Sequence, residues 1–122
     1  MTDQPALHTV ILFTTRMAEL AEFYRQGLEL GQPQSSPGHL GFLLDNVYLG
    51  FDQVDEQPAR GGGTTLWFAV ADLDVTFQRF VSLGADVRYA PVQKPWGATL
   101  ASLVDPDGNI FGLVQQSEAG DR

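Results

Sequence analysis

Apolar runs interrupted by turn-forming residues divide the first half of the chain into short elements. The pattern predicts a strand at residues 9–14 and a helix at 17–28. It also predicts a two-stranded hairpin whose strands span residues 39–44 and 47–52. Gly31 and Pro33 are expected to end the helix, since neither residue favours helical backbone. Asp45 and Asn46 predict the hairpin turn, because both residue types tolerate left-handed backbone.

The second half repeats this order of elements. Its pattern predicts a strand at residues 64–71 and a helix at 72–83. Three further strands are predicted at residues 86–90, 98–104 and 109–115. Asp72 or Asp74 is suited to cap the helix, and Gly84 to end it. The segment Asp105-Pro106-Asp107-Gly108 is a turn signature, whose aspartates are expected to accept backbone hydrogen bonds rather than to act as an acid–base pair. Each half therefore has the order β-α-β-β, with a possible short extra strand after the helix.

Alternation along the predicted strands sorts their side chains onto two faces. One face is uniformly apolar and is expected to pack under the helices: Val10, Leu12, Leu49, Phe51, Leu66, Phe68, Val70, Phe111 and Leu113. The other face mixes small, aromatic and polar residues: Thr9, Ile11, Phe13, Tyr48, Gly50, Asp52, Thr65, Trp67, Ala69, Ile110, Gly112 and Val114. Such a mixture suits a concave surface that admits a small molecule.

The two halves align with one another, which indicates a duplicated module. Three pairs at similar separations carry the alignment: Thr9 with Thr65, Met17 with Leu73, and Gly50 with Gly112. We expect one domain over residues 1–122, divided into module one at about 7–52, a linker at 53–63 and module two at about 64–116. The linker is indicated by composition, since it contains Gly61-Gly62-Gly63 without the Lys-Ser/Thr of a phosphate-binding loop.

Composition narrows the range of partners. The 122 residues are 43% hydrophobic, which is enough for one packed core. A formal net charge of -8 disfavours nucleic acid and favours cations. The absence of cysteine excludes disulfides, thiolate metal sites and a cysteine nucleophile. Neither a signal peptide nor a membrane span is recognisable, so a cytoplasmic location without membrane contact is expected.

Four motifs resemble those of the vicinal oxygen chelate superfamily, which includes glyoxalase I, extradiol dioxygenases and bleomycin resistance proteins. They are Leu12 to Tyr24 ending in Glu22-Phe23-Tyr24-Arg25, the Val70-Ala71-Asp72-Leu73 junction, Trp96-Gly97, and Asp105 to Leu113. The resemblance covers nearly the whole chain. It implies an α+β fold in which two tandem βαβββ modules form a half-open barrel with a concave pocket for a small molecule.

The resemblance also implies where a metal would be bound. The metal-dependent members carry His, Gln or Glu ligands at four positions, which match Thr9, Gly50, Thr65 and Gly112 here. Glycine has no side chain, and a neutral threonine hydroxyl is a poor ligand for a divalent metal. We therefore expect no metal and no other cofactor.

His8 is the main objection to a metal-free site. Leu7-His8-Thr9 resembles the opening strand of glyoxalase I, and a one-residue β-bulge would turn His8 inward. One imidazole nevertheless lacks the partners that a metal site needs.

Aromatic residues remain as candidates for binding a ligand. The expected contacts are Phe13, Tyr48, Asp52, Trp67 and Trp96. Trp67 and Phe13 are expected at corresponding inward positions, where flat rings stack on planar or cationic molecules. Trp96 lies in a predicted loop, where it could close a pocket or meet a second subunit. By analogy with bleomycin resistance proteins, the sequence favours a homodimer that sequesters a planar or cationic aromatic compound.

The alternative is an enzyme of the same superfamily. A metal-dependent lyase, isomerase or dioxygenase would use His8, whereas a metal-independent isomerase or cyclase would use His39 or Tyr48. His39 opens a strand beside the expected cavity, and histidine is suited to proton transfer near neutral pH. The sequence leaves the ligand, and whether it is transformed, open.

Overall fold

A computed structural model describes residues 7–59 and 63–116 of the chain. Its elements in module one are β1 (Thr9–Thr14), α1 (Met17–Gly27), β2 (Gln34–Ser36), β3 (His39–Leu43) and β4 (Tyr48–Gln53). Those in module two are β5 (Leu66–Val70), α2 (Leu73–Ser82), β6 (Asp86–Gln93), β7 (Thr99–Val104) and β8 (Ile110–Gln115). The fold is α+β, with two tandem βαβββ modules, as predicted.

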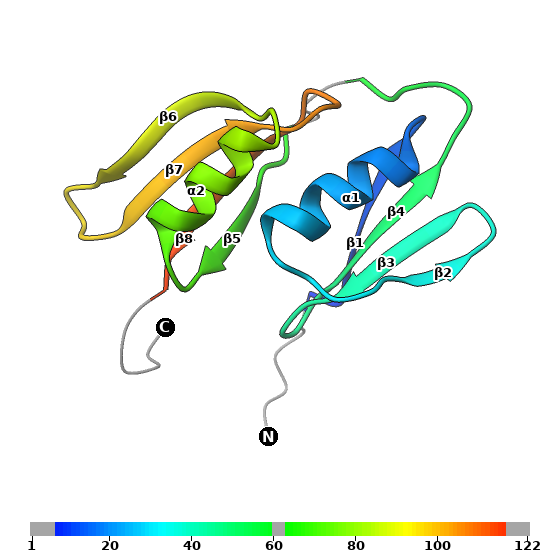
Figure 1. The fold of residues 1–122 in the computed structure, drawn as a ribbon, viewed down its shortest axis with the longest axis horizontal. Helices are drawn as coiled ribbons and strands as arrows, with labels where there is room; N and C mark the ends of the chain where they lie inside the picture. Colours follow the sequence, from blue (N-terminus) through cyan, green and yellow to red (C-terminus); the bar gives the residue numbers. More distant parts are fainter. Residues whose placement is uncertain (1–6, 60–62, 117–122) are drawn as a thin grey trace.

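Each module contains one mixed sheet of four strands (Figure 1). The strand orders are β1-β4-β3-β2 and β5-β8-β7-β6, so the first and last strands of each module lie side by side and run parallel. The other strand pairs are antiparallel. Within the described ranges neither sheet closes into a barrel, and β1 and β5 remain edge strands.

Most predicted elements are confirmed, including the short strand after each helix. Asp72 caps α2, because its carboxylate accepts a hydrogen bond from the Val75 amide (3.2 Å). The first helix ends one residue before the predicted end. Helix α1 ends at Gly27, and Glu29 takes the left-handed conformation (φ 57°) while the Leu30 amide bonds back to the Arg25 carbonyl (2.8 Å).

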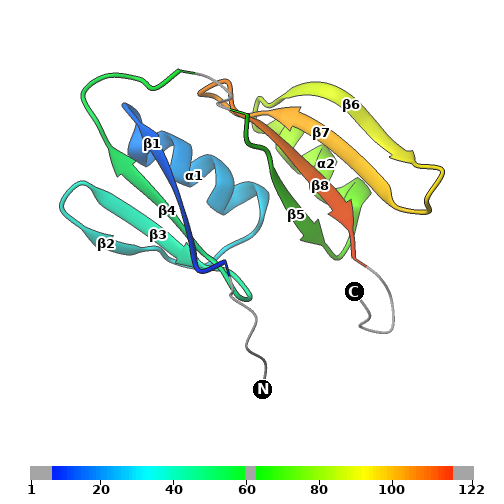
Figure 2. The same ribbon diagram turned by 180° about the vertical axis from the view of Figure 1, so that it is seen from behind.

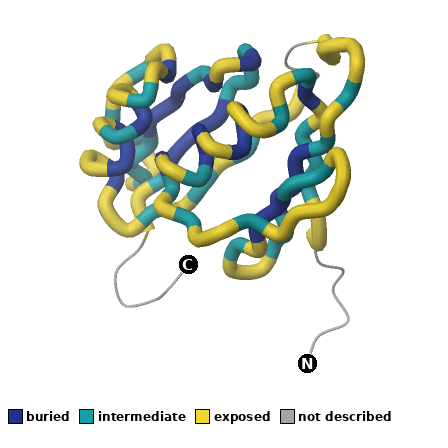
Figure 3. The backbone as a smooth tube through the Cα atoms, turned by 45° about the vertical axis from the view of Figure 1, so that its right-hand side comes forward, coloured by how far each residue is buried: buried dark blue, intermediate teal, exposed yellow. Residues whose placement is uncertain are grey.

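One side of each sheet is covered by its own helix (Figure 1), and the view from behind shows the opposite sides without a helix (Figure 2). Burial follows this division. The buried apolar strand residues have the parity of Leu49, Phe51, Phe111 and Leu113, as predicted. Figure 3 shows buried stretches along the strands and helices, with exposed turns between them.

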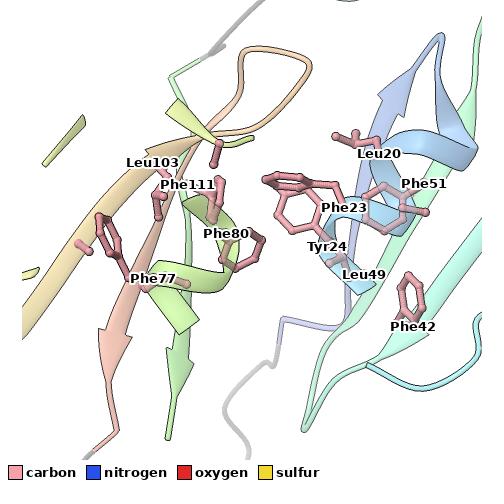
Figure 4. Packing of buried hydrophobic residues seen from close by; sticks show 14 of the residues in the cluster. Leu20, Phe23, Tyr24, Phe42, Leu49, Phe51, Phe77, Phe80, Leu103 and Phe111 are labelled. Atoms are coloured by element: carbon pink, nitrogen blue, oxygen red, sulfur yellow. The ribbon is translucent and has the colours of Figure 1, made fainter. Parts of the chain in front are cut away.

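Aromatic rings of α1 join the two modules in one core. The Tyr24 ring lies 5.3 Å from the Phe111 ring of β8, and the Phe23 ring lies 5.1 Å from the Phe80 ring of α2 (Figure 4). Gly27 allows this approach, because a Cβ there would lie only 2.1 Å from Phe80. The two modules therefore share apolar packing across α1 and α2.

A buried polar contact, which we call the inter-module clamp, links α1 to the turn between β7 and β8. The Tyr24 hydroxyl donates to Asp105 Oδ2 (2.7 Å), and the Arg16 guanidinium pairs with Asp107 Oδ1 (2.8 Å). Asp105 also accepts from the backbone amides of Asp107 and Asn109, which confirms the predicted turn role. Burial raises the pKa of Asp105, and burial together with the Asp105 charge raises the pKa of Tyr24 well above its usual value.

The helices α1 and α2 contain 11 and 10 residues, and no helix in the described ranges is long and apolar enough to cross a membrane. Gly61 and Gly62 of the predicted linker lie outside the described residues. The N-terminal residues 1–6, on which the expectation about a signal peptide depends, also lie outside them.

Candidate functional site

The side of each sheet that carries no helix, which we call its open face, displays most of the predicted binding residues. Strand register places Ile11 beside Gly50 and Gly50 beside Gly41 on the open face of module one. In module two, Trp67 lies beside Gly112 and Gly112 beside Ser102. The counterpart of Trp67 is therefore Ile11 rather than Phe13. The prediction that Phe13 corresponds to Trp67 is wrong, because it departs by two residues from the register of the parallel strands.

Trp67 lies across Gly112 on the open face of module two. A Cβ at Gly112 would lie 2.2 Å from Trp67 Cε3 and Cζ3, so the six-membered ring covers the glycine backbone. Trp67 is nevertheless 45% exposed. A large aromatic ring is thus supported on the glycine backbone and remains available to a planar molecule.

Three predicted residues form a hydrogen-bonded trio on the open face of module one. His39 Nδ1 lies 2.5 Å from Asp52 Oδ1, and His39 Nε2 lies 2.7 Å from the Tyr48 hydroxyl. The His39 and Tyr48 rings are nearly parallel, with 16° between their planes. The side chains of His39 and Asp52 are 26% and 36% exposed. Solvent can therefore reach the trio.

Glycines provide the space that the trio occupies. A Cβ at Gly41 would lie 1.8 Å from the Tyr48 hydroxyl, and a Cβ at Gly50 would lie 2.9 Å from His39 Cε1. Gly41 was not predicted to belong to the site. Its place opposite Gly50 in the predicted hairpin is the signal that identifies it.

The residues at the four positions where the resemblance implies metal ligands do not fit a divalent metal. The donor set consists of two threonine hydroxyls, from Thr9 and Thr65, and two positions without side chains, Gly50 and Gly112. The space above each glycine is filled, by Ile11 and His39 at Gly50 and by Trp67 at Gly112. Residues 7–59 and 63–116 contain no group of three or more His, Cys, Asp or Glu side chains that could hold a metal ion.

Of the remaining candidates, the structure brings Phe13 beside the trio. His8 is exposed, and its Nδ1 lies 2.5 Å from Thr9 Oγ1. Phe13 is 52% exposed and lies opposite Asp52 on the open face of module one. Trp96 is 70% exposed in the turn between β6 and β7, at the sheet edge opposite to β5 and hence to Trp67.

An open groove of about 1390 Å³ lies between the modules. Its walls are β5 with the start of α2 on one side, and the β3–β4 turn with the end of α1 on the other. Leu7, Leu43 and Trp67 line it and are among the most exposed large apolar residues of the described ranges. The groove reaches Trp67 but not the trio, so the structure offers two separate places for a ligand.

The model of a family described as "Glyoxalase-like domain" matches residues 9–114. The fold is similar to that of a glyoxalase-related enzyme from Fulvimarina pelagi (TM-score 0.79, 18% identity, 93% of this chain and 89% of the other). It is also similar to a glyoxalase/bleomycin resistance protein/dioxygenase family enzyme from Burkholderia phytofirmans PsJN (TM-score 0.78, 22% identity, 91% of this chain and 98% of the other). A lactoylglutathione lyase from Agrobacterium tumefaciens has a similar fold (TM-score 0.72, 20% identity, 98% of this chain and 99% of the other). The chain matches no curated protein.

Proposed function

Because the chain belongs to the glyoxalase-like domain family of the vicinal oxygen chelate superfamily, we propose that it is a metal-free small-molecule-binding protein. Its ligand is a planar or cationic aromatic compound, held against the open face of module two beside the inter-module groove. Trp67 is the observation that carries the proposal. Its ring rests on Gly112, stays 45% exposed and borders the groove.

Charge supports a cationic ligand. The net charge of -8 raises the local concentration of cations around the protein. An exposed indole ring also attracts a cation that lies over its face, by about 0.5–2 kcal/mol. The net charge and the exposed indole ring therefore support a flat cation as the ligand.

Thermal unfolding with proflavine, a planar aromatic cation, tests this proposal. Ligand at about 100 times its dissociation constant stabilises a folded protein by about 2.7 kcal/mol. Trp67→Ala should abolish the upward shift of the unfolding temperature. Val81→Ala, which truncates an exposed residue of α2 outside the groove, should preserve it. An equal shift in Trp67→Ala and the native protein would exclude Trp67 as the binding surface.

The proposal includes a homodimer in the cytoplasm. The free edges of β1 and β5 and the exposed apolar residues of the groove support contact with a second copy. Trp96 offers another exposed aromatic for a subunit contact.

A metal-independent isomerase or cyclase is the second candidate, and the trio of His39, Tyr48 and Asp52 favours it. A metal-dependent enzyme that uses His8 has less support, because His8 is exposed and the family's metal positions carry poor donors. Thermal unfolding with Ni²⁺, Zn²⁺, Mn²⁺ and Fe²⁺, together with elemental analysis, tests this. Stoichiometric binding that His8→Ala removes would contradict a metal-free protein.

A further inference from the structure

The trio on the open face of module one has the groups needed for proton transfer, and its proposed role rests on the proposed binding of small molecules. We propose that Tyr48 exchanges a proton with a neutral aromatic ketone bound on this face. His39 and Asp52 are positioning residues that act through Tyr48. The site would therefore interconvert a ketone and its enol without a metal.

The order of hydrogen bonds fixes the direction of each proton. The Asp52 carboxylate can only accept, so the hydrogen between it and His39 belongs to Nδ1. His39 Nε2 then carries a lone pair and accepts the hydrogen bond of the Tyr48 hydroxyl. The phenolic proton points at His39, which leaves a lone pair of the Tyr48 oxygen free to accept a proton from a ligand.

The surroundings of Tyr48 favour a neutral and apolar ligand. Ile11 and Phe13 lie on the same open face, and Phe13 is 52% exposed. None of the strands β1 to β4 contains Lys or Arg, so no strand residue of this face offers a cation to a carboxylate or phosphate. Asp52 adds a negative charge to the face. A neutral aromatic ketone meets these conditions.

The reaction needs no oxidant, reductant or second substrate. The Tyr48 oxygen takes a proton from the carbon next to the carbonyl group, and the C–H bond breaks as the new O–H bond forms. At the same time the original phenolic proton moves to His39 Nε2, so Tyr48 stays neutral and His39 becomes an imidazolium paired with Asp52. The electron pair of the C–H bond moves to the carbonyl oxygen and gives an enolate. Return of a proton to the same carbon or to the oxygen completes the exchange.

Exchange of carbon-bound hydrogen in D₂O tests this step. The probe is 2-tetralone, a neutral aromatic ketone, and ¹H NMR follows the loss of the signal from the methylene group between ring and carbonyl. The native protein should accelerate this loss over buffer, and Tyr48→Phe should slow the protein-catalysed rate about a hundredfold. Tyr89→Phe removes a hydroxyl outside the trio and should leave the rate unchanged. Circular dichroism and the urea midpoint establish that each variant is folded.

The role of Asp52 in positioning His39 is tested separately, by exchange kinetics and by ¹⁵N NMR. Asp52→Asn should lower the exchange rate at saturating 2-tetralone while the half-saturating concentration stays the same. In ¹⁵N NMR, His39 should be protonated at Nδ1 when neutral, and Asp52→Asn should remove that preference. Conversely, a ¹⁵N spectrum of native His39 with Nε2 protonated would overturn the assigned order of hydrogen bonds.

The two proposals fail in different ways. No acceleration by the native protein, or full activity in Tyr48→Phe, overturns proton exchange but leaves proflavine binding at Trp67 untouched. Loss of proflavine binding with retained exchange overturns the proposed cation site at Trp67 instead.

Discussion

Two strand glycines, Gly50 and Gly112, have a structural consequence at the scale of single residues. Gly112 supports the Trp67 ring, and Gly50 admits Ile11, His39 and Tyr48. A side chain at either glycine would occupy space that these groups now fill. Glycine at these two positions thus leaves room for aromatic and imidazole rings.

Gly112→Ala tests this at Trp67. The new Cβ would lie 2.2 Å from the ring, so Trp67 must move, and we expect a loss of about 1–3 kcal/mol in the free energy of unfolding. Urea unfolding measures this loss, and tryptophan fluorescence reports the displaced ring. Gly31→Ala is the matched control, because its Cβ would have nothing within 4 Å. Similar stability and fluorescence in the two variants would contradict close packing of Trp67 on Gly112.

At the scale of elements, the two most recognisable sequence motifs contact one another. Tyr24 of α1 and the Asp105 to Asn109 turn meet in the inter-module clamp, and Phe23 packs against Phe111 of β8, which follows the turn. Asp105 accepts four hydrogen bonds, from Tyr24, Asp107 and twice from Asn109. Burial, together with the charge and hydrogen bond of Asp105, explains the raised pKa of Tyr24, so the shift does not indicate a catalytic site there.

Tyr24→Phe should lower the free energy of unfolding by about 1.5–3 kcal/mol near neutral pH, because Asp105 loses a hydrogen bond to a buried charge. The raised pKa of Tyr24 means that above about pH 10 the unfolded chain ionises this residue while the folded chain keeps it protonated. The native protein therefore loses this stabilisation as pH rises. Its advantage over Tyr24→Phe should shrink by about 1.4 kcal/mol between about pH 9 and about pH 11. A constant difference in urea unfolding across this range would contradict the shifted pKa.

At the scale of the whole molecule, the two modules share a core at α1 and α2 but leave a groove, and within the described ranges β1 and β5 are edge strands. The groove displays Leu7, Leu43 and Trp67, which are apolar in a protein of net charge -8. Apolar burial would favour association of two copies across this surface, whereas their like charges oppose it.

Salt should therefore strengthen the proposed homodimer. Sedimentation equilibrium should give twice the 13.3 kDa of one chain, with a larger dimer fraction at about 0.5 M than at about 0.02 M NaCl, because salt screens the repulsion. Leu43→Glu should weaken the dimer, since it places a charge in the groove, and Val81→Glu should not. A monomer at every salt concentration would exclude the homodimer.

Local sequence determined the strands, the helices, their two faces and the family. Periods of about 2 and 3.6 residues depend only on near neighbours, so Phe51 and Phe111 were assigned to the core and Tyr48 and Trp67 to the other face from the sequence alone. The end of α1 was misplaced because Glu29, rather than a glycine, adopts the left-handed conformation. That choice depends on backbone hydrogen bonds that composition does not reveal.

Tertiary structure decided how these residues combine. A symmetric hairpin around Asp45 and Asn46 already places His39 opposite Asp52, but the reach of the Tyr48 hydroxyl over Gly41 depends on side-chain rotamers. The contact of Trp67 with Gly112 requires the register of two parallel strands far apart in the chain. The Tyr24 bond to Asp105 requires the two modules to pack together. Contacts of this kind depend on the whole packed core, whereas sequence periodicity describes each element separately.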